Sequence, residues 1–122
     1  MADHVVPQVD FPVEQLTVAV LLEGPRRHGL SRDDAQRLAN EHVMYIIGLA
    51  EAGHLLHAGL LIDDGPQPAL TGLSFSRLSR DELRPLLERD PSVLAGMNDI
   101  RLVTHSFPKG GLAFPRAHAR TR

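Results

Sequence analysis

The sequence predicts one α+β domain whose elements follow the order β-α-β-β-α-β. Its 122 residues suit a single hydrophobic core. A long segment repeats apolar residues every three or four positions, which indicates a helix, and short β-branched segments bounded by Gly, Pro or Asp indicate strands. This order is that of a ferredoxin-like fold, a four-stranded antiparallel sheet with two helices on one face. We expect the domain to span residues 1–122.

The first half of the chain is predicted to contain two strands and the longer helix. Residues 16–22 (LTVAVLL) form a β-branched strand that ends at a Gly-Pro pair. Ser31 is the expected N-cap of the helix, and Gly53 is its expected C-cap. A second strand covers residues 54–62. One face of the helix is apolar and consists of Ala35, Leu38, Ala39, His42, Tyr45, Ile46 and Leu49.

The second half is predicted to contain two strands and a shorter helix. Residues 71–78 (TGLSFSRL) alternate between apolar and polar side chains, which indicates a half-exposed third strand. Ser79 and Glu82 form a capping box at the start of the second helix, which ends at an Asp-Pro pair. A Gly-containing connection then leads to the last strand, over residues 100–107.

Three further segments are expected to lie outside the regular elements. Residues 1–12 are predicted to be a flexible arm. Residues 108–122 are predicted to be a basic tail that is mobile or exchanged with a partner subunit. Residues 24–29 (GPRRHG) carry two adjacent arginines, a pattern that fits either an anion-binding loop or a solvated basic loop.

The two predicted strands of the first half are apolar on both faces. Helices cover only one face of a ferredoxin-like sheet, so the other apolar face requires a second cover. We therefore predict a homodimer in which two sheets meet.

Composition argues against several classes of function. The net charge of −2 is unlike that of proteins that bind nucleic acid, and the third strand lacks the paired aromatic residues of an RNA-recognition motif. The chain has no cysteine, and its histidine spacings match no metal motif, so we predict no metal and no cofactor. It shows neither a signal-peptide pattern nor an apolar run of about 20 residues. We expect a cytoplasmic protein that does not bind a membrane.

Two segments carry a recognisable pattern, HVMYIIGLAEAGHLLHAG at residues 42–59 and DPSVLAGM at residues 90–97. In order and spacing they resemble the YCII-related (YciI-like) family of the dimeric α/β-barrel superfamily. The resemblance implies the ferredoxin-like fold, dimerisation through the sheets and a site built on His42 and Asp90. It also implies reactions close to dehalogenation or lactone isomerisation of small aromatic-derived acids. The chain departs from the family pattern at Ala39, where members often carry a basic residue, and at Leu60, where they tend to carry Pro.

His42 is the main candidate for chemistry because it lies in the middle of the apolar helix face. A histidine can act as a general acid or base near neutral pH. If Asp90 reaches it, the carboxylate would fix the tautomer and stabilise the imidazolium. Both residues also have structural readings, His42 as a hydrogen-bonded core residue and Asp90 as a helix stop. No motif places a Ser or Cys nucleophile nearby, which favours proton transfer over covalent catalysis.

Two other residues are candidates for substrate binding. Tyr45 lies about one helical turn beyond His42 and fits either a hydrogen-bond donor to a substrate or a packing residue. His105 lies near the end of the last strand and fits either a substrate contact at the dimer seam or a surface residue.

The sequence therefore supports two hypotheses about function. The first is a lyase or isomerase that acts on a small molecule with His42 and Asp90 as an acid/base pair. The second is a non-catalytic dimeric module of the same fold that binds a ligand or a protein.

Overall fold

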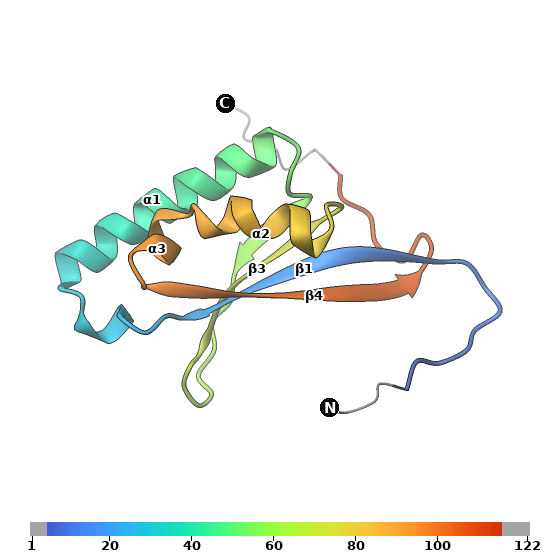
Figure 1. The fold of residues 1–122 in the computed structure, drawn as a ribbon, viewed down its shortest axis with the longest axis horizontal. Helices are drawn as coiled ribbons and strands as arrows, with labels where there is room; N and C mark the ends of the chain where they lie inside the picture. Colours follow the sequence, from blue (N-terminus) through green and yellow to red (C-terminus); the bar gives the residue numbers. More distant parts are fainter. Residues whose placement is uncertain (1–4, 116–122) are drawn as a thin grey trace.

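A computed structural model of the chain describes residues 5–115 and has two layers, a sheet and a helical layer that covers one of its faces (Figure 1). The prediction of a ferredoxin-like α+β fold is confirmed. The strands are β1 (Val13–Glu23), β2 (His57–Leu60), β3 (Leu70–Ser76) and β4 (Asn98–Pro108). The helices are α1 (Arg32–Glu51), α2 (Arg80–Glu88), α3 (Pro91–Leu94) and a short 3-10 turn, η1 (Arg27–Gly29).

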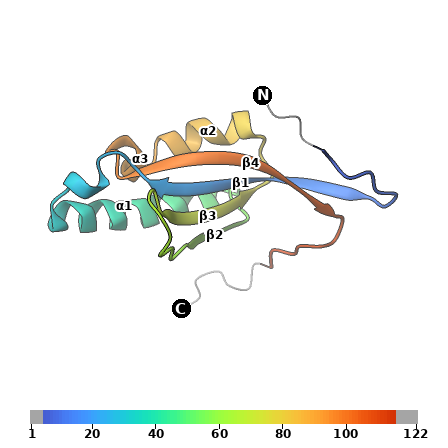
Figure 2. The ribbon, with the colours of Figure 1, turned by 90° about the horizontal axis from the view of Figure 1, so that it is seen from below.

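The sheet has the strand order β2-β3-β1-β4, and every neighbouring pair is antiparallel. The two long strands, β1 and β4, lie side by side, and both run beyond the helical layer (Figure 2). At the centre of the sheet, Val18 pairs with Phe75 on one side and with Val103 on the other. The next residue, Ala19, pairs with Ser74 and Leu102 and therefore faces the opposite way.

The core lies between the sheet and the helices. Ala19 and Leu102 come from the sheet, Leu49 from α1, and Leu83 and Leu87 from α2. Leu83 and Leu87 are almost fully buried, and burying a leucine side chain stabilises a fold by about 1.5–3 kcal/mol. The predicted apolar face of the long helix is correct, because all seven of its residues are buried or half-buried.

Both long helices begin at the predicted residues. The Ser31 hydroxyl accepts a hydrogen bond from the Asp34 amide at 3.0 Å and caps α1. Ser79 and Glu82 form the reciprocal capping box of α2. Gly53 follows the cap residue of α1, Ala52, rather than occupying the cap itself, and its positive φ of 87° lets the chain turn away from the helix.

The faces of β3 are the least expected feature of the sheet. The serines Ser74 and Ser76 are buried under the helices, whereas Leu73 and Phe75 are half-buried on the other face. The Ser76 hydroxyl donates to the carbonyl of His54 at 2.6 Å, which holds the turn before β2 against β3. The small serines of β3 therefore face the helices, and its larger apolar residues face the uncovered side of the sheet.

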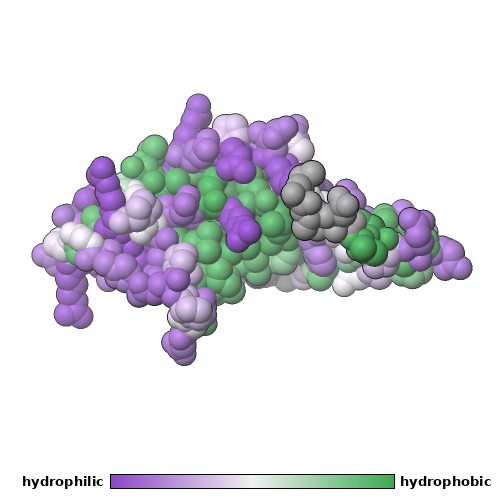
Figure 3. Space-filling model, turned by 60° about the horizontal axis from the view of Figure 1, so that its bottom comes forward, coloured by the Kyte–Doolittle hydropathy of each residue, from purple (hydrophilic) through white to green (hydrophobic). Residues whose placement is uncertain are grey.

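The uncovered face of the sheet is rich in hydrophobic side chains. Figure 3 shows them as a broad patch on that side of the molecule. This open face, as we call it, includes Leu73 and Phe75 from β3, which are half-buried, and Val103 from β4, which is exposed. Leu16 and Val18 from β1 point to the same side but are already buried within one chain. Phe75 also contacts Phe114, whose ring centroid lies 5.6 Å away, so the segment after β4 covers part of the open face.

The loop after β1 lies against the turn between α3 and β4. The Gly24 amide donates to the Met97 carbonyl at 2.9 Å, and the Arg26 amide donates to the Gly96 carbonyl at 2.8 Å. A Cβ atom on Gly24 would lie 2.4 Å from the Gly96 carbonyl oxygen. The atoms that this Cβ would meet belong to the backbone and cannot move aside as the end of a flexible side chain could. Only glycine at position 24 therefore permits this approach.

Substitution of Gly24 by alanine is therefore expected to lower the free energy of unfolding by about 1–3 kcal/mol. Gly48, an exposed glycine of α1 with open space around its Cβ position, is the matched control. There alanine should raise stability by about 0.5–1 kcal/mol because it restricts the unfolded chain. Urea unfolding of Gly24→Ala and Gly48→Ala measures the two changes in the free energy of unfolding. Equal effects of the two substitutions would contradict the close contact at Gly24.

Parts of three predictions fall on residues outside the described range. These are the beginning of the arm (residues 1–4), the end of the basic tail (residues 116–122), and the exchange of that tail with a partner. Within residues 5–115, no helix has the length and apolar composition needed to cross a membrane.

Candidate active site

The structure brings His42 and Asp90 together at the junction of α1 and α3. His42 lies on the α1 face that packs against the rest of the molecule, and its Nδ1 is 2.5 Å from Asp90 Oδ2. Asp90 has a further role, because its Oδ1 accepts the backbone amide of Ser92 at 2.9 Å and caps α3. The Asp-Pro pair thus ends one helix and starts another, which the sequence did not indicate.

The Asp90 carboxylate is only 1% exposed and is fully hydrogen-bonded. Oδ1 accepts both the backbone amide and the hydroxyl of Ser92, each at 2.9 Å, and Oδ2 faces His42. A buried carboxylate requires such partners, since leaving a buried polar group unsatisfied costs about 1–3 kcal/mol. Asp90 is therefore firmly held and presents one oxygen to the imidazole.

His42 is less buried than its partner. Its side chain is 23% exposed, and no residue in the described part of the chain hydrogen-bonds to Nε2. A ring with Nδ1 held by a carboxylate and Nε2 open to solvent can exchange a proton with a bound molecule. This arrangement can perform general acid/base chemistry.

Three residues that the sequence did not single out, Ser92, Asn98 and Thr71, extend the pair inward. The Ser92 hydroxyl lies between Asp90 and Asn98, and the Asn98 side-chain nitrogen donates to it at 2.9 Å. The Asn98 oxygen accepts from Arg27 Nη2 at 2.8 Å and from the Thr71 hydroxyl at 3.0 Å. Ser92 and Asn98 are buried polar residues beside an apolar run, VLAGM, and that contrast was the available sequence signal.

Arg27 comes from the basic loop for which the sequence left two readings. Its Nε donates to the Met97 carbonyl at 3.2 Å, and its Nη2 donates to Asn98, so the guanidinium is bound to the fold. Beside it, Glu23 accepts the Ala69 amide, and this hydrogen bond is the main reason that its pKa lies below the usual value. At least one arginine of this loop therefore has a structural role.

The structure places Tyr45 in the packing between α1 and α2. Its hydroxyl donates to the Leu86 carbonyl at 2.6 Å, and its ring packs against the core. Burial raises the pKa of Tyr45 above its usual value of 10.0 because the charged form is poorly solvated there. These contacts favour the packing reading over substrate binding.

Substitution of Tyr45 by phenylalanine is expected to lower the free energy of unfolding by about 0.5–1.5 kcal/mol at neutral pH, because one hydrogen bond is lost. The raised pKa of Tyr45 also makes its contribution to stability depend on pH. The neutral phenol stabilises the fold fully below the pKa of the unfolded chain, about 10, and this contribution is lost as pH rises through the higher folded-state pKa. Urea unfolding between pH 7 and 11 should therefore show an alkaline decline that is smaller in Tyr45→Phe.

His105 lies away from the His42–Asp90 pair. It pairs with Leu16 across β1 and β4, which places it on the open face, and its ring stacks on Phe107 with centroids 5.0 Å apart. His42 packs on the helical side of the sheet. The two histidines therefore do not meet within one chain, and a substrate contact by His105 remains a prediction that concerns the open face.

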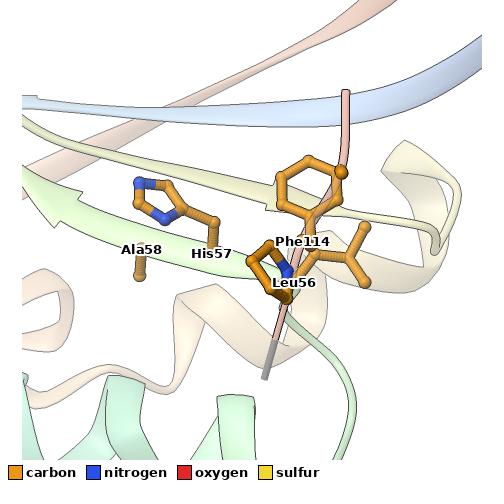
Figure 4. Close-up of a pocket in the computed structure, with 6 residues that line it drawn as sticks. Leu56, His57, Ala58 and Phe114 are labelled. Carbon is orange, nitrogen blue, oxygen red and sulfur yellow. The ribbon is translucent and has the colours of Figure 1, made fainter. Parts of the chain in front are cut away.

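Two hollows on the surface are lined by other residues. The larger, about 350 Å³, lies at the edge strand β2 and is lined by Leu56, His57, Ala58, Ala113, Phe114 and Pro115. Figure 4 shows the His57 and Ala58 side chains on opposite sides of β2. The second, about 280 Å³, lies at the start of α2. Within residues 5–115, no three His, Asp or Glu side chains gather as a metal site would require.

Comparison with solved structures supports the fold. The chain is similar to the 5-chloro-2-hydroxyhydroquinone dehydrochlorinase from Burkholderia phenoliruptrix AC1100, solved in complex with 2,5-dihydroxybenzoquinone. The TM-score is 0.50 and the identity 18%, over 78% of this chain and 95% of the dehydrochlorinase. A de novo designed protein, Ferredog-Diesel, aligns with a TM-score of 0.43 and 10% identity, over 84% and 97% of the two chains. No protein-family model matches the chain, and no curated protein is similar to it in sequence.

Proposed function

We propose that the protein is a lyase or isomerase that moves a proton on a small molecule, with His42 as the catalytic acid/base and Asp90 as its partner. The observation that carries the proposal is the 2.5 Å contact between His42 Nδ1 and a carboxylate that is 1% exposed, together with an Nε2 that has no partner in the described residues. A carboxylate held in this way fixes the orientation of the imidazole and leaves Nε2 available to a bound molecule.

The proposed step uses both ring nitrogens of His42. Nδ1 carries a proton donated to Asp90, so the lone pair of the neutral ring lies on Nε2, which takes a proton from carbon or oxygen of the substrate. The positive charge then formed on the ring is stabilised by the Asp90 carboxylate. In an isomerisation Nε2 then returns the proton to another atom of the substrate. In an elimination the electron pair of the broken C–H bond forms a double bond, the leaving group departs with its bonding electrons, and Nε2 gives it the proton. General acid/base catalysis of this kind contributes about 10²–10⁴-fold to a rate.

The substrate class is proposed from two likenesses. The segments that resemble the YCII-related family imply reactions on small aromatic-derived acids. The similar dehydrochlorinase is named for a chlorinated hydroxyhydroquinone and binds 2,5-dihydroxybenzoquinone. We propose small hydroxylated quinones and related ring acids, whose acidic C–H and O–H groups suit a histidine base.

The test combines binding with proton exchange. Protein labelled with ¹⁵N and ¹³C at histidine is titrated with 2,5-dihydroxybenzoquinone and with a panel of hydroxylated benzoic acids, and the His42 ring resonances are followed by NMR. Incorporation of deuterium from D₂O into each compound is then measured with and without protein. We expect a shift of the His42 resonances and protein-dependent exchange that His42→Gln lowers at least about 10²-fold.

His54→Gln is the matched control, because His54 is also half-buried but lies in the turn before β2. It should leave exchange unchanged. Exchange that is equal in wild type and His42→Gln would reject the catalytic role, whichever compounds bind.

The alternative, a non-catalytic binding module of the same fold, is favoured by one observation. The hollow of about 350 Å³ at β2 has an aromatic and imidazole lining that includes neither His42 nor Asp90, so a ligand bound there needs no acid/base pair. If the same titration shifts the His57 resonances while His42 is silent and no exchange occurs, this second function is the correct one.

We also propose that the protein works as a homodimer joined through the open face. The support is the apolar composition of that face, on which Val103 is 41% exposed, and the placement of the small serines of β3 on the helical side. Two sheets packed face to face would remove this apolar surface from water. A cytoplasmic location of the protein remains a prediction from the sequence.

A further inference from the structure

We infer that Ser92, Asn98 and Arg27 form a hydrogen-bonded relay that positions the Asp90 carboxylate for His42. The inference rests on the proposed role of His42. It concerns residues from the loop after β1, from α3 and from β4, none of which touches the imidazole at a normal hydrogen-bond distance. Together they determine which atom donates in each hydrogen bond between Arg27 and Asp90.

The direction of the relay starts at Arg27. A guanidinium has only donors, so its Nη2, 2.8 Å from Asn98, requires the oxygen of the amide at that point. The Thr71 hydroxyl, 3.0 Å from the same oxygen, is a second donor to it. The Asn98 amide is therefore fixed in one orientation, and its nitrogen points toward Ser92.

The Ser92 hydroxyl inherits its direction from Asn98. Because the amide nitrogen donates to Ser92 Oγ at 2.9 Å, the hydroxyl oxygen is the acceptor there. Its single proton is then available for Asp90 Oδ1, which lies 2.9 Å away. Ser92 is fully buried, so no water competes for this proton. The 3.5 Å separation of Ser92 Oγ and His42 Nδ1 is too long to compete with it.

Asp90 completes the relay. Two donors from Ser92, its amide and its hydroxyl, hold Oδ1, which leaves Oδ2 as the acceptor for His42. A carboxylate oxygen can only accept, so the hydrogen bond between the two groups is donated by Nδ1. The donors of Arg27 thus set, through two neutral side chains, the direction of each hydrogen bond, and the Asp90 oxygen left for Nδ1 selects the tautomer that leaves Nε2 free. Ser92 and Asn98 are positioning residues in this scheme.

The relay depends on the close approach of two loops. Arg27 reaches Asn98 because the loop that contains Gly24 lies against the Gly96 turn, where a Cβ on Gly24 would be 2.4 Å from a carbonyl oxygen. The Asn98 end is held by β4, which pairs along its whole length with β1. A network built on backbone contacts of this kind is rigid, as a positioning device must be.

NMR of the His42 ring tests the inference without any substrate. In protein labelled with ¹⁵N-histidine, long-range ¹H–¹⁵N correlations report the tautomer, and the Nδ1 proton of a ring bonded to a buried carboxylate gives a separate downfield signal. We expect wild type to show the Nδ1–H tautomer and this signal. Asp90→Asn, whose amide nitrogen can donate to Nδ1, provides the reference for the opposite tautomer.

Two variants interrupt the relay at different points. Ser92→Ala removes the hydroxyl that binds Oδ1. Asn98→Asp keeps an acceptor for Arg27 and Thr71 but replaces the donor to Ser92, so that one hydroxyl proton must serve two carboxylates. In each we expect the downfield signal to be lost, or its exchange with water to become at least tenfold faster.

Thr71→Val is the matched control. It removes a hydrogen bond from the same Asn98 oxygen, but Arg27 remains and still fixes the amide, so the signal and the tautomer should be retained. Amide spectra of each variant establish that it is folded, and Ser92→Ala decides if Asn98→Asp does not fold.

The outcomes separate this inference from the proposed function. Loss of the signal in Ser92→Ala with retention in Thr71→Val supports the relay even if no compound undergoes exchange. Variants that are less stable but keep the wild-type signal and tautomer show a structural role only and overturn the inference. An Nε2–H tautomer in wild type would overturn it as well, and would do so whatever the exchange assays show.

Discussion

Asp90→Ala is expected to lower the free energy of unfolding by about 3 kcal/mol. The substitution removes three hydrogen bonds at once, to the His42 ring and to the amide and hydroxyl of Ser92. Two of these donors are buried and would be left without a partner, at about 1–3 kcal/mol for each donor. One of them, the Ser92 amide, is also the group that Asp90 caps at the start of α3, so the lost N-cap is already part of this cost. Urea or thermal unfolding at neutral pH measures the change.

Two other substitutions serve as comparisons for Asp90→Ala. Asp81→Ala removes a carboxylate from the exposed first turn of α2 and should change stability by less than about 1 kcal/mol. Asp90→Asn keeps an oxygen that can cap α3, so it should cost less than Asp90→Ala. It should nevertheless remove the proposed activity, because its amide selects the wrong imidazole tautomer.

The same three variants separate stability from chemistry. If Asp90→Asn and Asp90→Ala lose stability equally, Asp90 acts mainly through its charge on His42 and the cap contributes little. If both are as stable as wild type, the hydrogen bonds of the buried Asp90 carboxylate do not stabilise the fold. The measurement therefore examines the site even before a substrate is found.

Local patterns indicated the positions of His42 and Asp90 but not that they meet. The spacing of apolar residues placed His42 on the inner face of a helix, and the Asp-Pro pair marked a helix boundary. Their pairing was expected only from the resemblance to the YCII-related family. Arg27, Thr71 and Asn98 are far apart along the chain, and they meet only because strand register and the Gly24–Gly96 approach bring them together. No local pattern contains that information.

Two features of the fold illustrate the same limit. Alternation in β3 correctly separated Leu73 and Phe75 from the serines, but alternation identifies which residues share a face, not which face the helices cover. The four residues of α3 are too few to display a helical period, so that segment was read as a connection. Its N-cap, Asp90, was visible in the sequence only as the end of α2.

The apolar open face leads to the second large expected effect, which concerns association. We expect wild type to sediment as a dimer of the 13.4 kDa chain and Val103→Arg to sediment as a monomer. Val103 is 41% exposed and faces away from the helices beside Val18, so an arginine there would place a charge without a partner between two sheets. A penalty of several kcal/mol weakens self-association roughly 100-fold or more.

Val43→Arg is the control for Val103→Arg, because Val43 is 52% exposed on α1, on the helical side of the molecule. It introduces the same charge without touching the open face and should leave the dimer intact. Analytical ultracentrifugation over a range of concentrations compares the three proteins. A wild-type protein that remains monomeric at every concentration would mean that the open face is covered within one chain, for which the contact between Phe75 and Phe114 is the available evidence. In that case His105 and the apolar residues beside it could not form a site between two sheets, and the His42–Asp90 pair would have to act within a single chain.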